Sequence, residues 1–237
     1  MLSTLQPTVQ LSVRPISRFF SSSSSSLSAS SIPSRVYSGL YYHPAPSPAP
    51  TTPPTRFSVS FLPSPPPNLA FSPTTLGFVR PLPPSATLSS FDQKDQPPRP
   101  QEDPRVPPIT PRNWDDNPQF LPLLHQFLQA NVENDLWLQT QAKAVEGNDT
   151  YIHIADQRAP ADANRQPHPQ DVLASVLVQE GKLVPSSYEA NTTAYRLVSN
   201  DGLLQLPEQL RNGFIEACER VREIEKEAAE AEEGKGE

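Results

Sequence analysis

Residues 172–184 read VLASVLVQEGKLV, and this stretch decides which fold class the chain can adopt. The segment 172–179 is short and rich in β-branched residues, as strands are. Residues 180–181 are Glu-Gly, a two-residue turn candidate, and 182–184 returns as the partner strand before Pro185 stops the pairing. The stretch therefore predicts a β-hairpin.

Two further segments extend this prediction of a sheet. Residues 151–155 read YIHIA, and their alternation of apolar and polar side chains has the period of two that is typical of a strand. Residues 195–199 and 203–206 flank Asn-Asp-Gly at 200–202, and Asp-Gly between apolar runs is a strong hairpin signal. We therefore expect a second hairpin.

Helices are predicted on both sides of these strands. Asn117 and Pro118 favour a helix start, which Pro122 would move one turn later. A second helix over 133–146 ends at a glycine, and a last helix opens at Pro207 with an apolar stripe. The first two helices should form a helical hairpin.

Together these elements predict an α+β domain over residues 114–224. We expect a small antiparallel sheet of two hairpins plus one strand, with an N-terminal helical hairpin and a C-terminal helix. The charged tail, residues 225–237, is apolar only through alanine, so we expect it to fray.

The N-terminal half has a different composition. Of the chain's 31 prolines, 24 lie at or before Pro111, and proline removes a backbone donor from helices and sheets. Residues 38–113 are rich in proline, serine and threonine and have little apolar surface to offset chain entropy. We therefore expect the N-terminal half to be disordered, with 38–113 as a proline-rich, compositionally biased linker.

The first 37 residues have the features of an organelle transit peptide. No Asp or Glu precedes Asp92, whereas five arginines do. The leader also lacks the continuous apolar core that a secretory signal has. An Arg-x-aromatic pattern predicts cleavage between Phe20 and Ser21 or between Tyr37 and Ser38. We expect the leader to engage the import machinery of mitochondria. The alternative address is a plastid, or the cytosol or nucleus if the leader is not processed.

The remaining sequence argues against several functional classes. From Asp92 onward the chain has 14 basic and 26 acidic residues, which disfavours nucleic-acid binding. No apolar run approaches the ~18 residues of a membrane-spanning helix, so we expect no integral membrane segment. The single cysteine, Cys218, lies on the apolar stripe of the last helix and is expected to be buried.

The residues that could take part in catalysis or metal binding lie around the loop 156–171, without a close spacing in the sequence. His153, Asp156 and Arg158 are the candidates for a catalytic site there, and they carry no recognisable signature. His153, Asp156 and His168 could supply metal ligands, but their spacing is not that of a known metal site, so no metal is predicted. The glycines are explained by turns and caps, so no cofactor is predicted either.

The strand and hairpin residues resemble a small uncharacterised family of fungal proteins. The likeness rests on 171–176, 181–185, Tyr188, 195–198 and Gly202-Leu203, and it covers roughly residues 151–210. This resemblance implies no activity and no site residues.

These observations favour a mitochondrial protein that is not an enzyme and that binds other proteins, as an interaction or assembly factor. An acidic surface suits a basic protein partner. Two alternatives stay open: a small enzyme with a site around the loop 156–171, and a proline-rich scaffold in the cytosol or nucleus.

Overall fold

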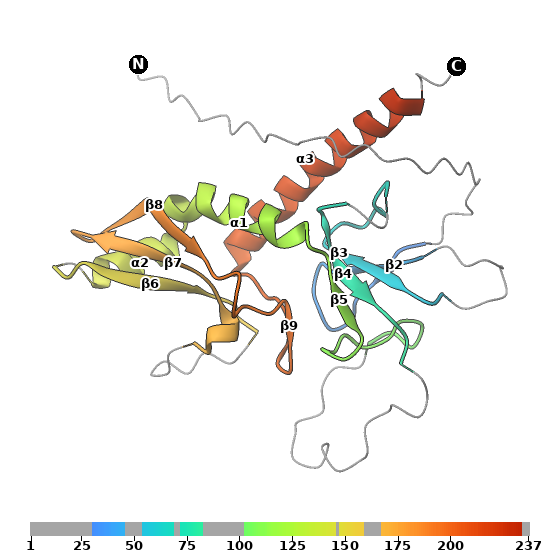
Figure 1. Ribbon diagram of the computed structural model, residues 1–237, viewed down its shortest axis with the longest axis horizontal. Coiled ribbons are helices and arrows are strands. Elements are labelled where there is room, and N and C mark those ends of the chain that lie inside the picture. The colour runs from blue at the N-terminus through green and yellow to red at the C-terminus, as the bar shows by residue number, and fades with distance from the viewer. Residues whose placement is uncertain are drawn as a thin grey trace, which may run out of the picture.

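The structure of the chain is a computed structural model that describes residues 30–45, 54–68, 72–82, 102–145, 147–158 and 167–233. Within these ranges it contains three α-helices and ten strands, and the strands form three antiparallel sheets (Figure 1). The five-stranded N-terminal sheet and the three-stranded sheet of residues 150–190 lie on either side of two helices, α1 (Phe120–Asn131) and the start of α3 (Glu208–Glu233).

The N-terminal sheet has five strands in sequence order. They are β1 (Ile32–Pro33), β2 (Tyr41–Pro44), β3 (Phe57–Ser60), β4 (Thr75–Val79) and β5 (Trp114–Asp116). Every neighbouring pair is antiparallel, and a bulge lies in β3 between Val59 and Ser60. All residues of β3 and β4 are buried.

The expected fold class, with its disordered N-terminal half, is therefore wrong. Strands β2, β3 and β4 lie within 38–113, and their residues Tyr42, Val59 and Leu76 are completely buried. The described prolines do not interrupt the strands. Pro33 lies in an edge strand and Pro44 ends β2, positions where a missing N–H costs little. The prediction failed because the average composition of 38–113 hides the short segments that form β2, β3 and β4.

The remaining strands also differ from the expected single sheet of two hairpins plus one strand. Strands β6 (Thr150–Ala155), β7 (Val172–Gln179) and β8 (Lys182–Ala190) form a three-stranded sheet with β7 in the centre. Strands β9 (Val198–Ser199) and β10 (Gly202–Leu203) pair only with each other. The carbonyls of Leu197 and Gly202 at this second hairpin accept hydrogen bonds from Arg158, and that of Leu197 also accepts one from the N–H of Leu204.

The helices begin close to the predicted starts. Helix α1 spans Phe120–Asn131 with Pro122 in its first turn, where the lost N–H has no helical partner. A short 3₁₀ helix, Val132–Asn134, leads into α2 (Leu136–Ala144), whose first turn is capped by the carboxylate of Asp135. Helix α3 spans Glu208–Glu233 and continues beyond residue 225, where we expected fraying.

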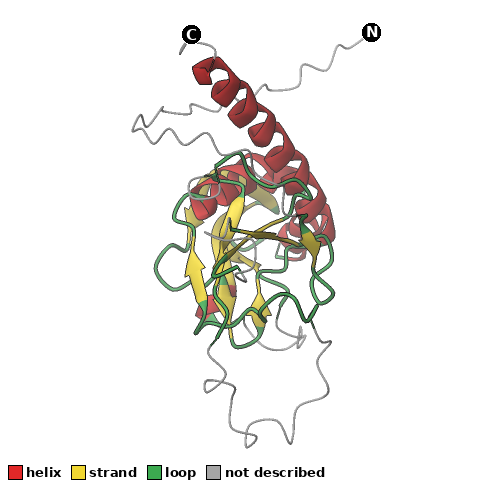
Figure 2. Cartoon of the chain, turned by 90° about the vertical axis from the view of Figure 1, so that its right-hand side faces the viewer, coloured by secondary structure: helices red, strands yellow, loops and turns green. Residues whose placement is uncertain are grey.

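Aromatic side chains join the N-terminal sheet to the helices. The ring of Phe214 on α3 lies edge-on to Phe61 and Phe120, with centroids 6.3 Å and 5.7 Å away, and Phe127 packs at 5.4 Å. These rings lie in one continuous core that includes residues of both large sheets. Figure 2 shows α3 passing beside the sheets and projecting beyond them at its C-terminal end.

Polar contacts between distant residues reinforce this packing. The buried guanidinium of Arg222 on α3 donates to the Thr74 hydroxyl and to the Ser64 carbonyl, the latter at 2.7 Å. The hydroxyl of Tyr37 accepts a hydrogen bond from the backbone N–H of Leu203, 3.2 Å away. The residues before β2 are therefore tied to the C-terminal part of the chain.

A buried histidine lies in the N-terminal sheet. The ring nitrogens of His43 are 2.9 Å from the hydroxyl of Ser31 and 2.8 Å from that of Ser60. Burial, together with the positive charge of Arg222, lowers the pKa of His43 from 6.5 to about 4. The folded protein therefore holds this ring neutral under conditions in which the unfolded chain protonates it.

We predict that acid weakens the fold through His43. Because the unfolded chain binds the proton first, stability conferred by the neutral ring is present above pH 6.5 and is lost as the pH falls towards about 4. The loss from this one group is at most about 3 kcal/mol. Urea unfolding at a series of pH values measures it.

His43→Gln removes the titrating group, so the free energy of unfolding should fall less steeply over this pH range. His168→Gln, at an exposed position, should keep the slope of the unchanged protein. Equal slopes for His43→Gln and the unchanged protein would contradict the prediction.

Candidate functional site

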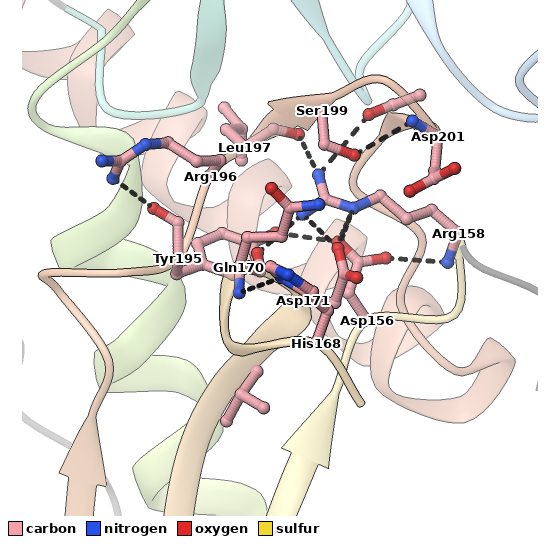
Figure 3. Close-up of polar contacts among 12 residues, drawn as sticks. Asp156, Arg158, His168, Gln170, Asp171, Tyr195, Arg196, Leu197, Ser199 and Asp201 are labelled. Atoms are coloured by element: carbon pink, nitrogen blue, oxygen red, sulfur yellow. Dashed lines mark hydrogen bonds and ion pairs between the residues drawn. The ribbon is translucent and has the colours of Figure 1, made fainter. Parts of the chain in front are cut away.

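The structure separates the three residues that the sequence suggested as a catalytic group. Asp156 and Arg158 follow β6 and turn into the protein, where they join a buried polar network (Figure 3). His153 lies within β6 on the sheet face that the helices do not cover. The three side chains do not converge on one hollow.

The buried network is built around the guanidinium of Arg158. Its Nε donates to a carboxylate oxygen of Asp171 at 2.8 Å, and its Nη2 lies 2.8 Å from the same oxygen. The remaining donors bond to backbone carbonyls, at 2.8 Å for Gln170 and 3.1 Å for Leu197. The network therefore joins the end of β6, the turn before β7 and the segment before β9.

Asp156 completes the network from the other side. Its carboxylate accepts hydrogen bonds from the Tyr195 hydroxyl at 3.0 Å and from the backbone N–H of Gln205 at 2.8 Å. Burial raises the pKa of this carboxyl, and the charge of Arg158 and the N–H donors oppose that shift. Burial also raises the pKa of the Tyr195 hydroxyl.

This network is suited to holding loops and not to meeting a substrate. The side chains of Asp156 and Arg158 are 0% exposed and that of Asp171 is 5% exposed. Two carboxylates share one guanidinium, so each depends on Arg158 for compensation of its charge. The residues proposed from sequence as polar groups of a pocket thus act together as a structural clamp, apart from His153.

His153 lines a hollow of about 480 Å³ on the open face of the β6–β7–β8 sheet. Its Nδ1 lies 2.9 Å from the hydroxyl of Ser175 on β7. The walls come from Pro167 and Pro169 at the end of the loop 156–171 and from the chain after β8. The concave surface next to the loop 156–171 is therefore this hollow, whereas the Arg158 network is buried.

The metal-ligand candidates are likewise separated. His168 accepts a hydrogen bond from the backbone N–H of Gln170 at 3.4 Å, whereas His153 bonds to Ser175. Across the residues that the structure describes, no group of three or more His, Cys, Asp or Glu side chains is placed to hold a metal ion. None of the helices in these residues is long and apolar enough to cross a bilayer.

A second surface was missed by the sequence reading. Leu136 and Trp137, at the start of α2, are 60% and 52% exposed, the highest exposures among the described large apolar side chains. They line a hollow of about 320 Å³ between α2 and the start of α3 at Pro207 and Glu208. The helical period could have predicted this exposure. Leu138 and Ala142 lie four residues apart on the buried face of α2, and Leu136 and Trp137 fall outside that face.

Comparison with known proteins suggests no function and no site residues for this chain. No family model, curated protein or solved structure matches this chain. The resemblance to fungal proteins over 151–210 accordingly stays a prediction.

The predicted cleavage positions fall in different parts of the chain. Phe20 and Ser21 lie outside the described residues. Tyr37 and Ser38 lie between β1 and β2, and Tyr37 packs against Gly202, whose φ of +119° and close neighbour favour glycine. A cut after Tyr37 would remove β1 and the Tyr37 hydroxyl from the fold.

We predict that Arg158→Met destabilises the protein by about 3–5 kcal/mol, because two buried carboxylates lose their counter-charge. Urea unfolding at pH 7 measures the change. The matched control is Arg196→Met, since Arg196 is exposed and bonds only to nearby backbone carbonyls, so its loss should stay below about 1 kcal/mol. Similar losses for the two variants would show that the network is not the clamp described above.

Proposed function

We propose that this chain is a mitochondrial protein-binding factor without enzymatic activity, which docks a basic segment of a partner protein on the Leu136–Trp137 surface. That surface comprises Leu136, Trp137 and the adjoining hollow with Pro207 and Glu208. The observation that carries the proposal is the exposure of two large apolar side chains side by side at the start of one helix.

The surface has the properties of a binding hot spot. Tryptophan is enriched among residues that dominate binding energy, and such residues lie beside well-formed concavities. The side chain of Asp135 caps α2 through the N–H of Leu138 at 2.8 Å, so the two apolar residues stand on an ordered helical turn. A preorganised apolar surface loses little entropy when a partner binds.

Charge favours a basic partner. Asp135 and Glu208 are the charged residues among those that line the hollow, and both are acidic. From Asp92 onward, acidic residues outnumber basic ones by 12. An apolar side chain flanked by Lys or Arg in the partner would match both the hollow and its rim.

The enzymatic alternative has weaker support. Asp156 and Arg158 are shielded within their network, so His153 is the remaining candidate that a substrate could reach. Glu189 lies across β7 from His153, beside Ser175, and therefore does not stand behind the imidazole as the acid of a Ser-His-Asp triad does.

The mitochondrial address is supported by the leader. Arginines without carboxylates are what import receptors and the membrane potential act on. Cleavage between Phe20 and Ser21 would leave every described residue in place. This position is therefore the proposed processing site, in preference to the one after Tyr37.

We predict that Trp137→Ala abolishes partner recognition while leaving the fold intact. A displayed library of 12-residue peptides, selected on the full chain, should yield an apolar anchor flanked by Lys or Arg. Trp137→Ala should weaken those peptides by about 30-fold or more, with a stability change below about 0.5 kcal/mol.

Ile224→Ala is the matched control, because Ile224 is 48% exposed and lies about 16 residues along α3, or roughly 24 Å, from the hollow. It should bind the selected peptides like the unchanged protein. Selected peptides that bind Trp137→Ala equally well, or that are acidic, would overturn the proposed surface.

We predict that the native protein, purified from the mitochondrial fraction, begins at or near Ser21. Recombinant 21–237 should unfold at the same temperature as the full chain, whereas 38–237 should unfold at a lower temperature because it lacks β1 and Tyr37. An intact Met1 would remove the import proposal. A native start at Ser38 would contradict the structural need for β1.

A further inference from the structure

We infer that the hollow on the open face of the β6–β7–β8 sheet is a binding site for a guanidinium group, of the kind an arginine side chain carries. Glu189 lines the hollow and follows Tyr188 in β8, and Tyr188 bonds to His125 of α1, so the hollow opens on the face turned away from that helix. It therefore does not depend on the Leu136–Trp137 surface or on the proposed function.

The floor of the hollow is a row of three polar side chains on adjacent strands. His153 on β6 is paired with Ser175 on β7, and Ser175 is paired with Glu189 on β8. Paired residues point to the same face of an antiparallel sheet, with Cβ atoms about 4.5–5.5 Å apart. An imidazole, a hydroxyl and a carboxylate thus stand side by side, and all three line the hollow.

The charge of this row selects a cation. Among the described residues that line the hollow, Glu189 is the charged one. No side chain in the described part of the chain forms an ion pair with it, so its carboxylate is available to a ligand. A carboxylate beside a hydroxyl oxygen presents acceptors to a planar donor, the arrangement that suits the N–H fork of a guanidinium.

The walls of the hollow are held in place. The side-chain amide of Asn191 donates to the carbonyls of Pro169 and Val172, at 2.9 Å and 2.8 Å, and its oxygen accepts from the N–H of Ala194 at 3.1 Å. These bonds join the turn before β7 to the chain after β8, at one end of the floor. Proline and alanine walls provide flat apolar contact for the plane and the methylene groups of an arginine.

A binding role fits this row better than nucleophilic catalysis. Ser175 lies between His153 and Glu189, so the carboxylate is next to the hydroxyl and cannot orient the imidazole from behind. An acidic neighbour also disfavours the oxyanion that acyl transfer would develop near Ser175. The same carboxylate favours a bound cation.

The test is a titration of the full chain with N-acetyl-arginine methylamide, followed by backbone amide NMR shifts. Saturable shifts should concentrate at residues 153, 175 and 189. Glu189→Gln should weaken binding by about fivefold or more, and Ser175→Ala by about two- to threefold. The citrulline analogue, which has the same shape without the charge, should not bind measurably.

Glu180→Gln is the matched control, because Glu180 is an exposed carboxylate in the β7–β8 turn that does not line the hollow. Its affinity for the arginine probe should be unchanged. The inference would be overturned if the citrulline analogue bound equally well or if Glu189→Gln left the affinity unchanged. Tighter binding of N-acetyl-lysine methylamide, the lysine analogue of the probe, would also overturn it. An arginine-containing peptide that binds more tightly than the amide would identify a protein partner as the source of the guanidinium.

Discussion

The fold depends on the aromatic contact that Phe214 makes with Phe61 and Phe120. Phe61 follows β3 of the N-terminal sheet, Phe120 begins α1 and Phe214 belongs to α3, so three distant parts of the chain meet at one point. Removing this contact would expose one side of the N-terminal sheet and of both helices. The rings belong to one continuous apolar core that reaches both large sheets, and polar contacts such as those of Arg222 and Tyr37 add to this packing.

The sequence indicated the elements whose signals are local. Strands β6 and β7 and the start of α3 follow from short apolar patterns and a proline, which act within a few residues. The N-terminal sheet escaped prediction because β1 to β5 are short and far apart in sequence, and composition averaged over long segments hides such strands. Pairing between β4 and β5, across more than thirty residues, has no local signal at all.

The candidate sites show the same division. Polar residues near the loop 156–171 were recognisable as a group, and the alternation of β6 indicates that His153 lies opposite Ile152 and Ile154, but sequence could not tell that Asp156 and Arg158 turn inward to Asp171. That outcome depends on the register of β6 against β7, and one residue of slip would reverse it. Glu189 and Ser175 drew no attention because only pairing across the sheet places them beside His153.

The projecting helix α3 has a consequence for how the chain reaches its native state. Its Glu225 carboxylate bonds to Ser72, 153 positions earlier, and Arg222 bonds to Ser64, 158 positions earlier. Contacts between residues so far apart in sequence slow folding, and α3 leaves the ribosome long after the N-terminal strands have been made. During synthesis the N-terminal strands therefore remain without the helix that packs beside them, until α3 has been made and can supply Phe214 and Arg222.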